Sequence, residues 1–100
     1  MKAINIEYVT PLETTNVKND NIDVWVTLDD GKIYSFLIAT PENIYWCMQN
    51  ESIDYYFGVP VLFVNELTRG NIERAINAIV EENNGKWINV YGTLQTRPQI

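Results

Sequence analysis

A tight turn between two alternating runs constrains the fold of this chain more than any other feature. Residues 22–29 and 32–39 alternate in side-chain character, and Asp30-Gly31 lies between them. Asp-Gly favours the positive φ angles that a two-residue hairpin turn requires. We therefore predict an antiparallel hairpin in which Trp25 faces Phe36 across the two strands.

This register divides the hairpin into two faces. The predicted core face is aliphatic and carries Ile22, Val24, Val26, Leu28, Ile33, Leu37 and Ala39. The opposite face carries Trp25, Tyr34, Phe36 and Ile38 between charged ends. Exposed rings with charged borders are typical of an interaction surface, so Trp25, Tyr34 and Phe36 form one candidate binding site. The alternative is that this face packs beneath residues 12–21 or 52–58, since large exposed apolar patches are uncommon.

The rest of the chain supplies further strands and two helices. Strands are expected at 3–9 (with Ile4, Ile6 and Tyr8 on one face), at 59–65, and at 86–94, where Trp87, Asn89 and Tyr91 alternate with Ile88 and Val90. A loop is expected at 12–21. Helices are expected at 41–50, with Thr40 as a cap, and from a Thr68 cap to Asn83-Asn84-Gly85, where Ile72, Ile76 and Ile79 recur at helical spacing. Ile44, Cys47 and Met48 share one face of the first helix. The order β-β-β-α-β-α-β over residues 1–100 predicts a single α+β domain. We expect an antiparallel sheet of about five strands with two helices on one face.

The absence of histidine removes much of the usual catalytic chemistry. Neither a Ser-His nor a Cys-His arrangement is available, and Cys47 is the only thiol. A zinc site needs several cysteines or histidines. We therefore expect no enzyme, no metal and no cofactor, and an enzyme based on carboxylates or tyrosine is the least favoured interpretation.

The acidic balance indicates the kind of partner. The net charge is −6, and no basic residue lies between Lys32 and Arg69. An acidic surface suits a basic protein partner and disfavours nucleic acid and anionic membranes. Residues 46–57 add tyrosines to these acids. The candidate contacts are Asp29, Asp30, Glu42, Glu51, Asp54, Tyr55 and Tyr56. The alternatives are an acidic surface kept for solubility, and a loop in which at least one of Tyr55, Tyr56 and Phe57 fills the core.

The lone cysteine also bears on the compartment. Cys47 has no second cysteine for an internal disulfide, so a reducing, cytoplasmic location is expected. No apolar run approaches the length of a membrane span, so no membrane association is expected.

Several segments together resemble a known group of proteins. Residues 30–36, 39–44, 61–64 and 67–68, followed by a helix, are similar in layout to small bacterial immunity proteins. These proteins inhibit polymorphic toxins, including those of contact-dependent growth inhibition. The resemblance implies a cytosolic inhibitor that binds a cognate toxin domain, often a nuclease, in a 1:1 complex. The alternative is a structural or assembly protein that forms a homodimer through the aromatic hairpin face.

Overall fold

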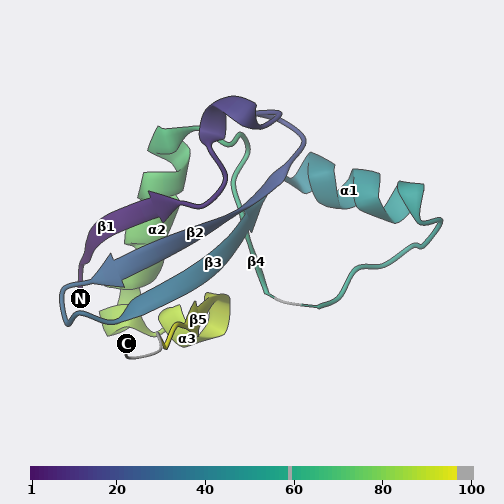
Figure 1. The fold of residues 1–100 in the computed structure, drawn as a ribbon. Helices are drawn as coiled ribbons and strands as arrows, with labels where there is room; N and C mark the ends of the chain where they lie inside the picture. Colours follow the sequence, from purple (N-terminus) through teal and green to yellow (C-terminus); the bar gives the residue numbers. More distant parts are fainter. Residues whose placement is uncertain (59, 97–100) are drawn as a thin grey trace.

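The computed structural model describes residues 1–58 and 60–96 of the chain. Within them lie the strands β1 (Ala3–Tyr8), β2 (Asn21–Leu28), β3 (Ile33–Ala39), β4 (Val61–Phe63) and β5 (Gly92–Leu94) (Figure 1). The α-helices are α1 (Pro41–Asn50), α2 (Arg69–Glu81) and α3 (Ile88–Tyr91), and 3-10 turns span Leu12–Thr14 and Glu82–Gly85. The predicted α+β class is confirmed.

The sheet is built around β3. Strands β1, β2 and β3 form an antiparallel meander. The other edge of β3 is shared: β5 pairs antiparallel with residues 34–36, and β4 pairs with residues 37–39. The β3–β4 pair is parallel, which departs from the predicted pairing. It is parallel because α1 and the following loop carry the chain back before β4 begins, as a parallel connection requires.

The predicted register of the β2–β3 hairpin is wrong by one residue. Trp25 lies opposite Ser35, and Val24 lies opposite Phe36. The turn has three residues instead of two: the N–H of Leu28 donates to the carbonyl of Lys32 at 2.9 Å, and the N–H of Gly31 donates to the carbonyl of Leu28 at 2.9 Å. Gly31 has a φ of 88°. This is a turn followed by a left-handed glycine bulge, which Asp-Gly supports as well as it supports the shorter turn.

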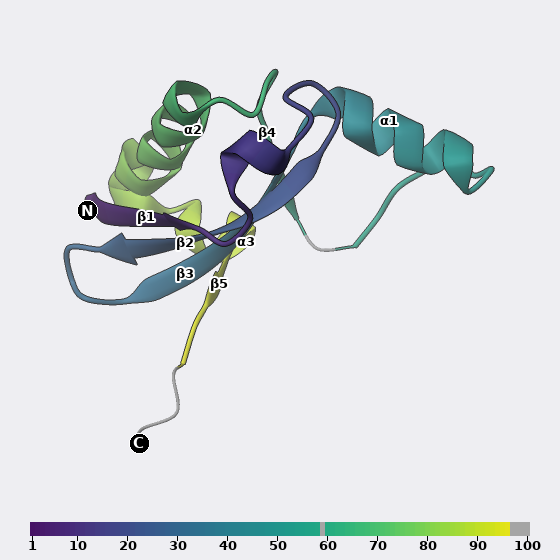
Figure 2. The ribbon, with the colours of Figure 1, turned by 45° about the horizontal axis from the view of Figure 1, so that its top comes forward.

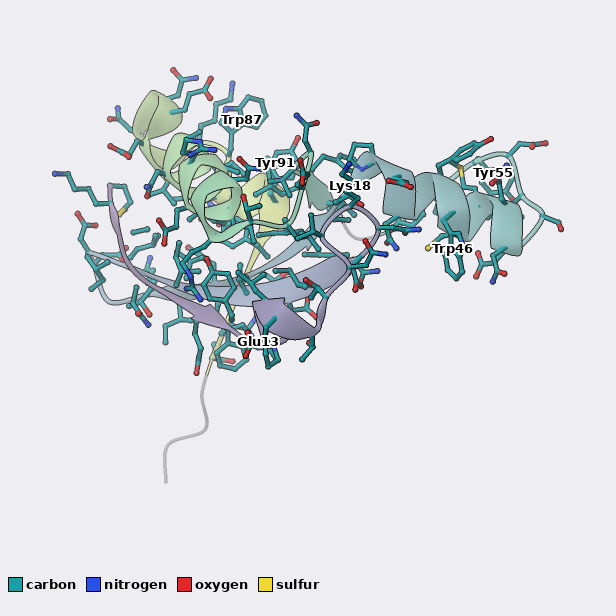
Figure 3. The ribbon with its side chains drawn as sticks, turned by 90° about the horizontal axis from the view of Figure 1, so that it is seen from above. Glu13, Lys18, Trp46, Tyr55, Trp87 and Tyr91 are labelled. Carbon is teal, nitrogen blue, oxygen red and sulfur yellow. The ribbon has the colours of Figure 1, made fainter. Side chains whose placement is uncertain are left out.

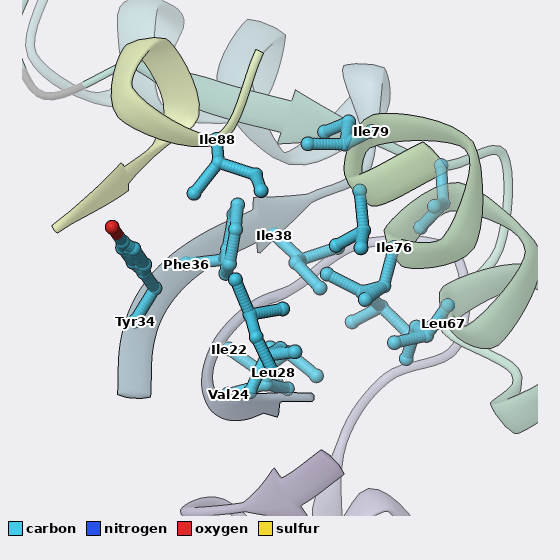
Figure 4. Packing of buried hydrophobic residues seen from close by; sticks show 14 residues of the cluster. Ile22, Val24, Leu28, Tyr34, Phe36, Ile38, Leu67, Ile76, Ile79 and Ile88 are labelled. Atoms are coloured by element: carbon cyan, nitrogen blue, oxygen red, sulfur yellow. The ribbon is translucent and has the colours of Figure 1, made fainter. Parts of the chain in front are cut away.

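The one-residue difference moves the side chains of β3 to the opposite face of the sheet. Tyr34, Phe36 and Ile38 are buried at 7%, 1% and 0% exposure. They join the predicted aliphatic residues of β2 in the core (Figure 4), whereas Ile33 and Leu37 lie on the other face with Trp25. The predicted aromatic face of Trp25, Tyr34 and Phe36 therefore does not exist, and the alternative homodimer surface built on it is withdrawn.

Helix α2 covers the core face of the sheet. Its predicted extent is confirmed, with Thr68 as the N-cap that accepts a hydrogen bond from the N–H of Asn71 at 3.2 Å. Ile72, Ile76, Ile79 and Val80 are buried against the sheet. Full burial of such side chains contributes about 1.5–3 kcal/mol each. The helix ends at Glu81, Glu82 is extended, and Asn83 and Asn84 adopt positive φ angles in the turn that follows, close to the predicted Asn-Asn-Gly stop.

The predicted strand over 86–94 is correct only at its end. Residues Ile88–Tyr91 form the helical turn α3, and β5 begins at Gly92. Trp87 and Tyr91 are four positions apart, so the helical turn brings their ring centroids to within 6.3 Å of each other. Ile88 packs into the core at 4% exposure. Gly92 then crosses Phe36, where an added Cβ would lie 2.8 Å from the Cζ of that ring.

The first strand shows a smaller departure. Ile6 and Tyr8 pack against the core as predicted, but Ile4 is 65% exposed. The pairing of β1 with β2 shifts between Ala3 and Asn5. A bulge of this kind reverses the alternation beyond it, so Ala3 replaces Ile4 at the core face.

Candidate protein-binding arm

Helix α1 and the loop that follows it project from the body of the molecule. Figures 1 and 2 show residues 41–58 extending from the end of the β2–β3 hairpin, away from α2. We call this segment the arm. Asn43 is the one residue of α1 that is buried. A groove of about 450 Å³, lined by Asn43, Trp46 and Cys47 on the helix side, lies between α1 and residues 19–21.

The root of the arm is fixed by polar contacts. Thr40 caps α1 by accepting a hydrogen bond from the N–H of Asn43 at 3.2 Å. The side-chain amide of Asn43 donates to Oδ1 of Asn19 at 3.0 Å, and its oxygen accepts from Nδ2 of Asn21 at 2.9 Å. Thr40 and Asn43 are 0% and 6% exposed, and these hydrogen bonds give both buried side chains the partners that buried polar groups require. The sequence predicted the Thr40 cap and missed the role of Asn43.

Beyond its root, α1 leaves its aromatic side chains in solvent. Tyr45 and Trp46 are 58% and 51% exposed. Nε2 of Gln49 donates to the hydroxyl of Tyr45 at 2.8 Å, a contact within the helix surface. The predicted apolar side, Ile44, Cys47 and Met48, is only half-buried. The helix is closed at its C-terminus, where Ser52 has a positive φ and the N–H of Ile53 donates to the carbonyl of Met48 at 2.9 Å.

The loop of the arm presents three consecutive aromatic rings. Tyr55, Tyr56 and Phe57 are 60%, 43% and 83% exposed, so the alternative in which one of them fills the core is wrong. The rings of Tyr55 and Phe57 stack with centroids 6.0 Å apart and planes inclined by 15°. Figure 3 places Tyr55 and Trp46 on the arm, far from Trp87 and Tyr91 on the body.

The charge of the arm has one sign. Its ionisable acids are Glu42, Glu51 and Asp54, and all three are exposed. Residues 41–58 contain no lysine, arginine or histidine. Neither Glu51 nor Asp54 has an ion pair or a side-chain hydrogen bond to any residue that the structure describes. A partner can therefore reach these carboxylates without displacing an internal contact.

The structure separates the predicted contacts into two groups. Glu42, Glu51, Asp54, Tyr55 and Tyr56 lie together on the arm. Asp29 and Asp30 lie at the tip of the β2–β3 hairpin, at the other end of the molecule (Figure 1). Oδ1 of Asp30 accepts from the N–H of Lys32 at 2.9 Å, which is a role in the turn. The candidate contacts chosen from the sequence omitted Tyr45, Trp46 and Phe57, although Trp46 falls on the side of the helix opposite its apolar residues.

The body offers little for catalysis among its described residues. No group of three or more cysteines and acids is arranged to hold a metal ion within residues 1–58 and 60–96. Burial raises the pKa of Tyr8, and the guanidinium of Arg69, 4.5 Å above its ring, opposes that rise. The hydroxyl of Tyr8 is buried and makes no hydrogen bond of normal geometry, although the Arg69 side chain is near enough to interact with it and oppose the rise in pKa. A raised tyrosine pKa keeps the hydroxyl protonated, which does not provide a general base at neutral pH.

Comparisons with known proteins add no family. No protein-family model, curated protein or solved structure matches this chain. In the described part of the chain, none of the helices has both the length and the apolar character needed to cross a membrane.

Proposed function

We propose that this protein is a binding module whose arm attaches to a basic surface of a protein partner. We further propose that it is an immunity-type inhibitor that forms a 1:1 complex with a toxin domain. The observation that carries the proposal is the arm itself, where exposed aromatic rings stand among carboxylates with no basic residue. Aromatic side chains surrounded by polar groups are typical of the residues that dominate binding energy in interfaces.

The length of α1 supports the same conclusion. A helix of ten residues is marginal in water unless something packs on it. Here the body holds only the root, through Thr40 and Asn43. A partner that covers Tyr45 and Trp46 would supply the missing burial, at about 25 cal/mol for each Å² of apolar surface removed from water.

The charge supports a basic partner and suggests how binding inhibits it. A net charge of −6 steers the protein toward a positive surface. Nucleases and other enzymes that act on phosphates have positive clefts. An arm that presents carboxylates can fill such a cleft and exclude the substrate without any chemistry of its own. A partner of this kind fits the resemblance to toxin inhibitors.

The direct test is a calorimetric titration with the C-terminal domain encoded immediately upstream, at low and high salt. We expect a tight 1:1 complex that weakens as salt rises. The charge reversal Asp54→Lys should weaken binding strongly, whereas Asp29→Lys, at the hairpin tip, should change it little. Absence of binding at micromolar concentrations would reject this pairing. If Asp54→Lys changes binding as little as Asp29→Lys does, the arm is not part of the interface.

A further inference from the structure

We propose that the loop of the arm holds a binding site for an arginine side chain, formed by the stacked rings of Tyr55 and Phe57 with Asp54. This inference rests on the proposed function, because it specifies which group of a basic partner the arm recognises.

The first part of the site is a pair of exposed, stacked aromatic rings. Tyr55 and Phe57 alternate with Tyr56 along the loop and stack nearly in parallel, 15° apart in plane. Phe57 is 83% exposed, so a large part of its ring is open to a ligand. The face of an aromatic ring is electrostatically negative and attracts a cation placed over it.

The second part of the site is an uncompensated charge next to the rings in the sequence. Asp54 directly precedes Tyr55, and Glu51 lies three residues earlier. Both side chains are exposed, and neither pairs with a cation in the described part of the chain. The nearest basic residues in the sequence, Lys32 and Arg69, lie outside the arm. The site thus has an open carboxylate and an open ring face, and no internal cation satisfies them.

Among the cations of proteins, the guanidinium group fits both parts. It is planar, weakly hydrated and able to stack on a ring while its N–H groups donate to a carboxylate through two bonds. The lysine ammonium is compact and strongly hydrated, so it gains less from the flat ring. An uncharged apolar ligand would leave Asp54 desolvated without a partner, which costs free energy.

The test compares two peptides of equal length and charge, one of alternating glycine and arginine and one of alternating glycine and lysine. NMR titration follows the amides of residues 51–58 in the full chain. We expect the arginine peptide to bind about tenfold more tightly than the lysine peptide. Phe57→Leu should remove this preference, because it deletes the ring and keeps an apolar side chain. Phe63→Leu is the matched control, since Phe63 is a half-exposed ring on β4, outside the arm.

Each other outcome has a definite meaning. Equal affinities for the two peptides, or a preference that survives Phe57→Leu, would overturn the arginine site. If both peptides then weaken with Asp54→Asn, the arm recognises charge alone and the proposed function stands. If neither peptide perturbs residues 51–58, the arginine site is rejected, and the titration with the upstream domain judges the proposed function separately.

Discussion

The body and the arm use the same residue types in opposite ways. Phe36 on β3 is 1% exposed, whereas Phe57 in the arm is 83% exposed. Ile22, Val24 and Val26 of the body are almost wholly buried, whereas the only buried residue of α1 is an asparagine. The body is therefore held by apolar burial, and the arm is attached by hydrogen bonds at its root. The difference predicts that the apolar surface of the arm contributes little to the stability of the fold, which is what the proposed binding role requires.

The largest expected effect is a contrast between two phenylalanines. Phe36→Ala opens a cavity under α2 and α3 and should lower the free energy of unfolding by about 3–5 kcal/mol. Phe57→Ala removes an exposed ring and should change it by less than about 0.5 kcal/mol. Urea unfolding of the two variants measures both. Similar losses at the two positions would mean that the arm packs on the body in solution.

An intermediate effect is expected at the root of the arm. Asn43→Ala removes the hydrogen bonds to Asn19 and Asn21 and should cost about 1–3 kcal/mol, because two part-buried hydrogen bonds of about 0.5–1.5 kcal/mol each are lost. Amide hydrogen exchange should accelerate throughout α1 and stay unchanged in α2. The control is Gln49→Ala, at an exposed position of the same helix. Unchanged exchange in α1 after Asn43→Ala would show that other contacts hold the arm.

The smallest effect compares two tyrosines. Tyr8→Phe removes a buried hydroxyl that makes no hydrogen bond of normal geometry, and it should raise stability by about 1 kcal/mol at neutral pH. Tyr45→Phe removes an exposed hydroxyl on the arm and should change stability by less than about 0.5 kcal/mol. Thermal unfolding at pH 7 distinguishes the two. A loss of stability in Tyr8→Phe would mean that the hydroxyl has a partner, such as a bound water.

Alkaline unfolding gives the Tyr8→Phe variant a second readout. Burial raises the pKa of Tyr8 in the folded protein above the ordinary value of 10.0. The unfolded tyrosine therefore ionises at a lower pH than the folded one. The free energy of unfolding is unaffected by this ionisation below about pH 10 and falls as the pH rises from there through the folded pKa. The wild-type protein should lose stability in that range more steeply than Tyr8→Phe does. Identical alkaline profiles would show that Tyr8 is not buried in solution.

Local sequence signals were enough for most elements. The Thr40 and Thr68 caps, the helical spacing of Ile72, Ile76 and Ile79, and the Asn-Asn-Gly stop predicted both long helices. They did so because caps and helical periodicity depend on residues within one turn. The prediction of a strand over 86–94 was wrong because residues four apart, such as Trp87 and Tyr91, lie on the same side of a strand and of a helical turn. The place where the strand begins also depends on the contact between Gly92 and Phe36, which is distant in the sequence.

The candidate site was predictable in composition and not in geometry. The sequence selected Glu51, Asp54, Tyr55 and Tyr56 from their charge and ring content, and these lie together on the arm. It also grouped them with Asp29 and Asp30, which lie at the opposite end of the molecule. Charge and composition do not say how far apart two residues lie in space. Residues that suit the same partner therefore cannot be assigned to one surface until the fold is known.

The sequence by itself determined the class of fold, the ends of the long helices and the acidic, histidine-free character of the surface, since each depends on residues close in the chain or on composition alone. Tertiary structure decided which face of β3 enters the core and that α1 leaves the body. A turn of three residues in place of two reverses every side chain of a strand, and Asp-Gly permits both. Only the packing of Phe36 and Ile38 beneath α2 and α3 selects between them, because the reversed strand would bury Ser35 and expose both residues.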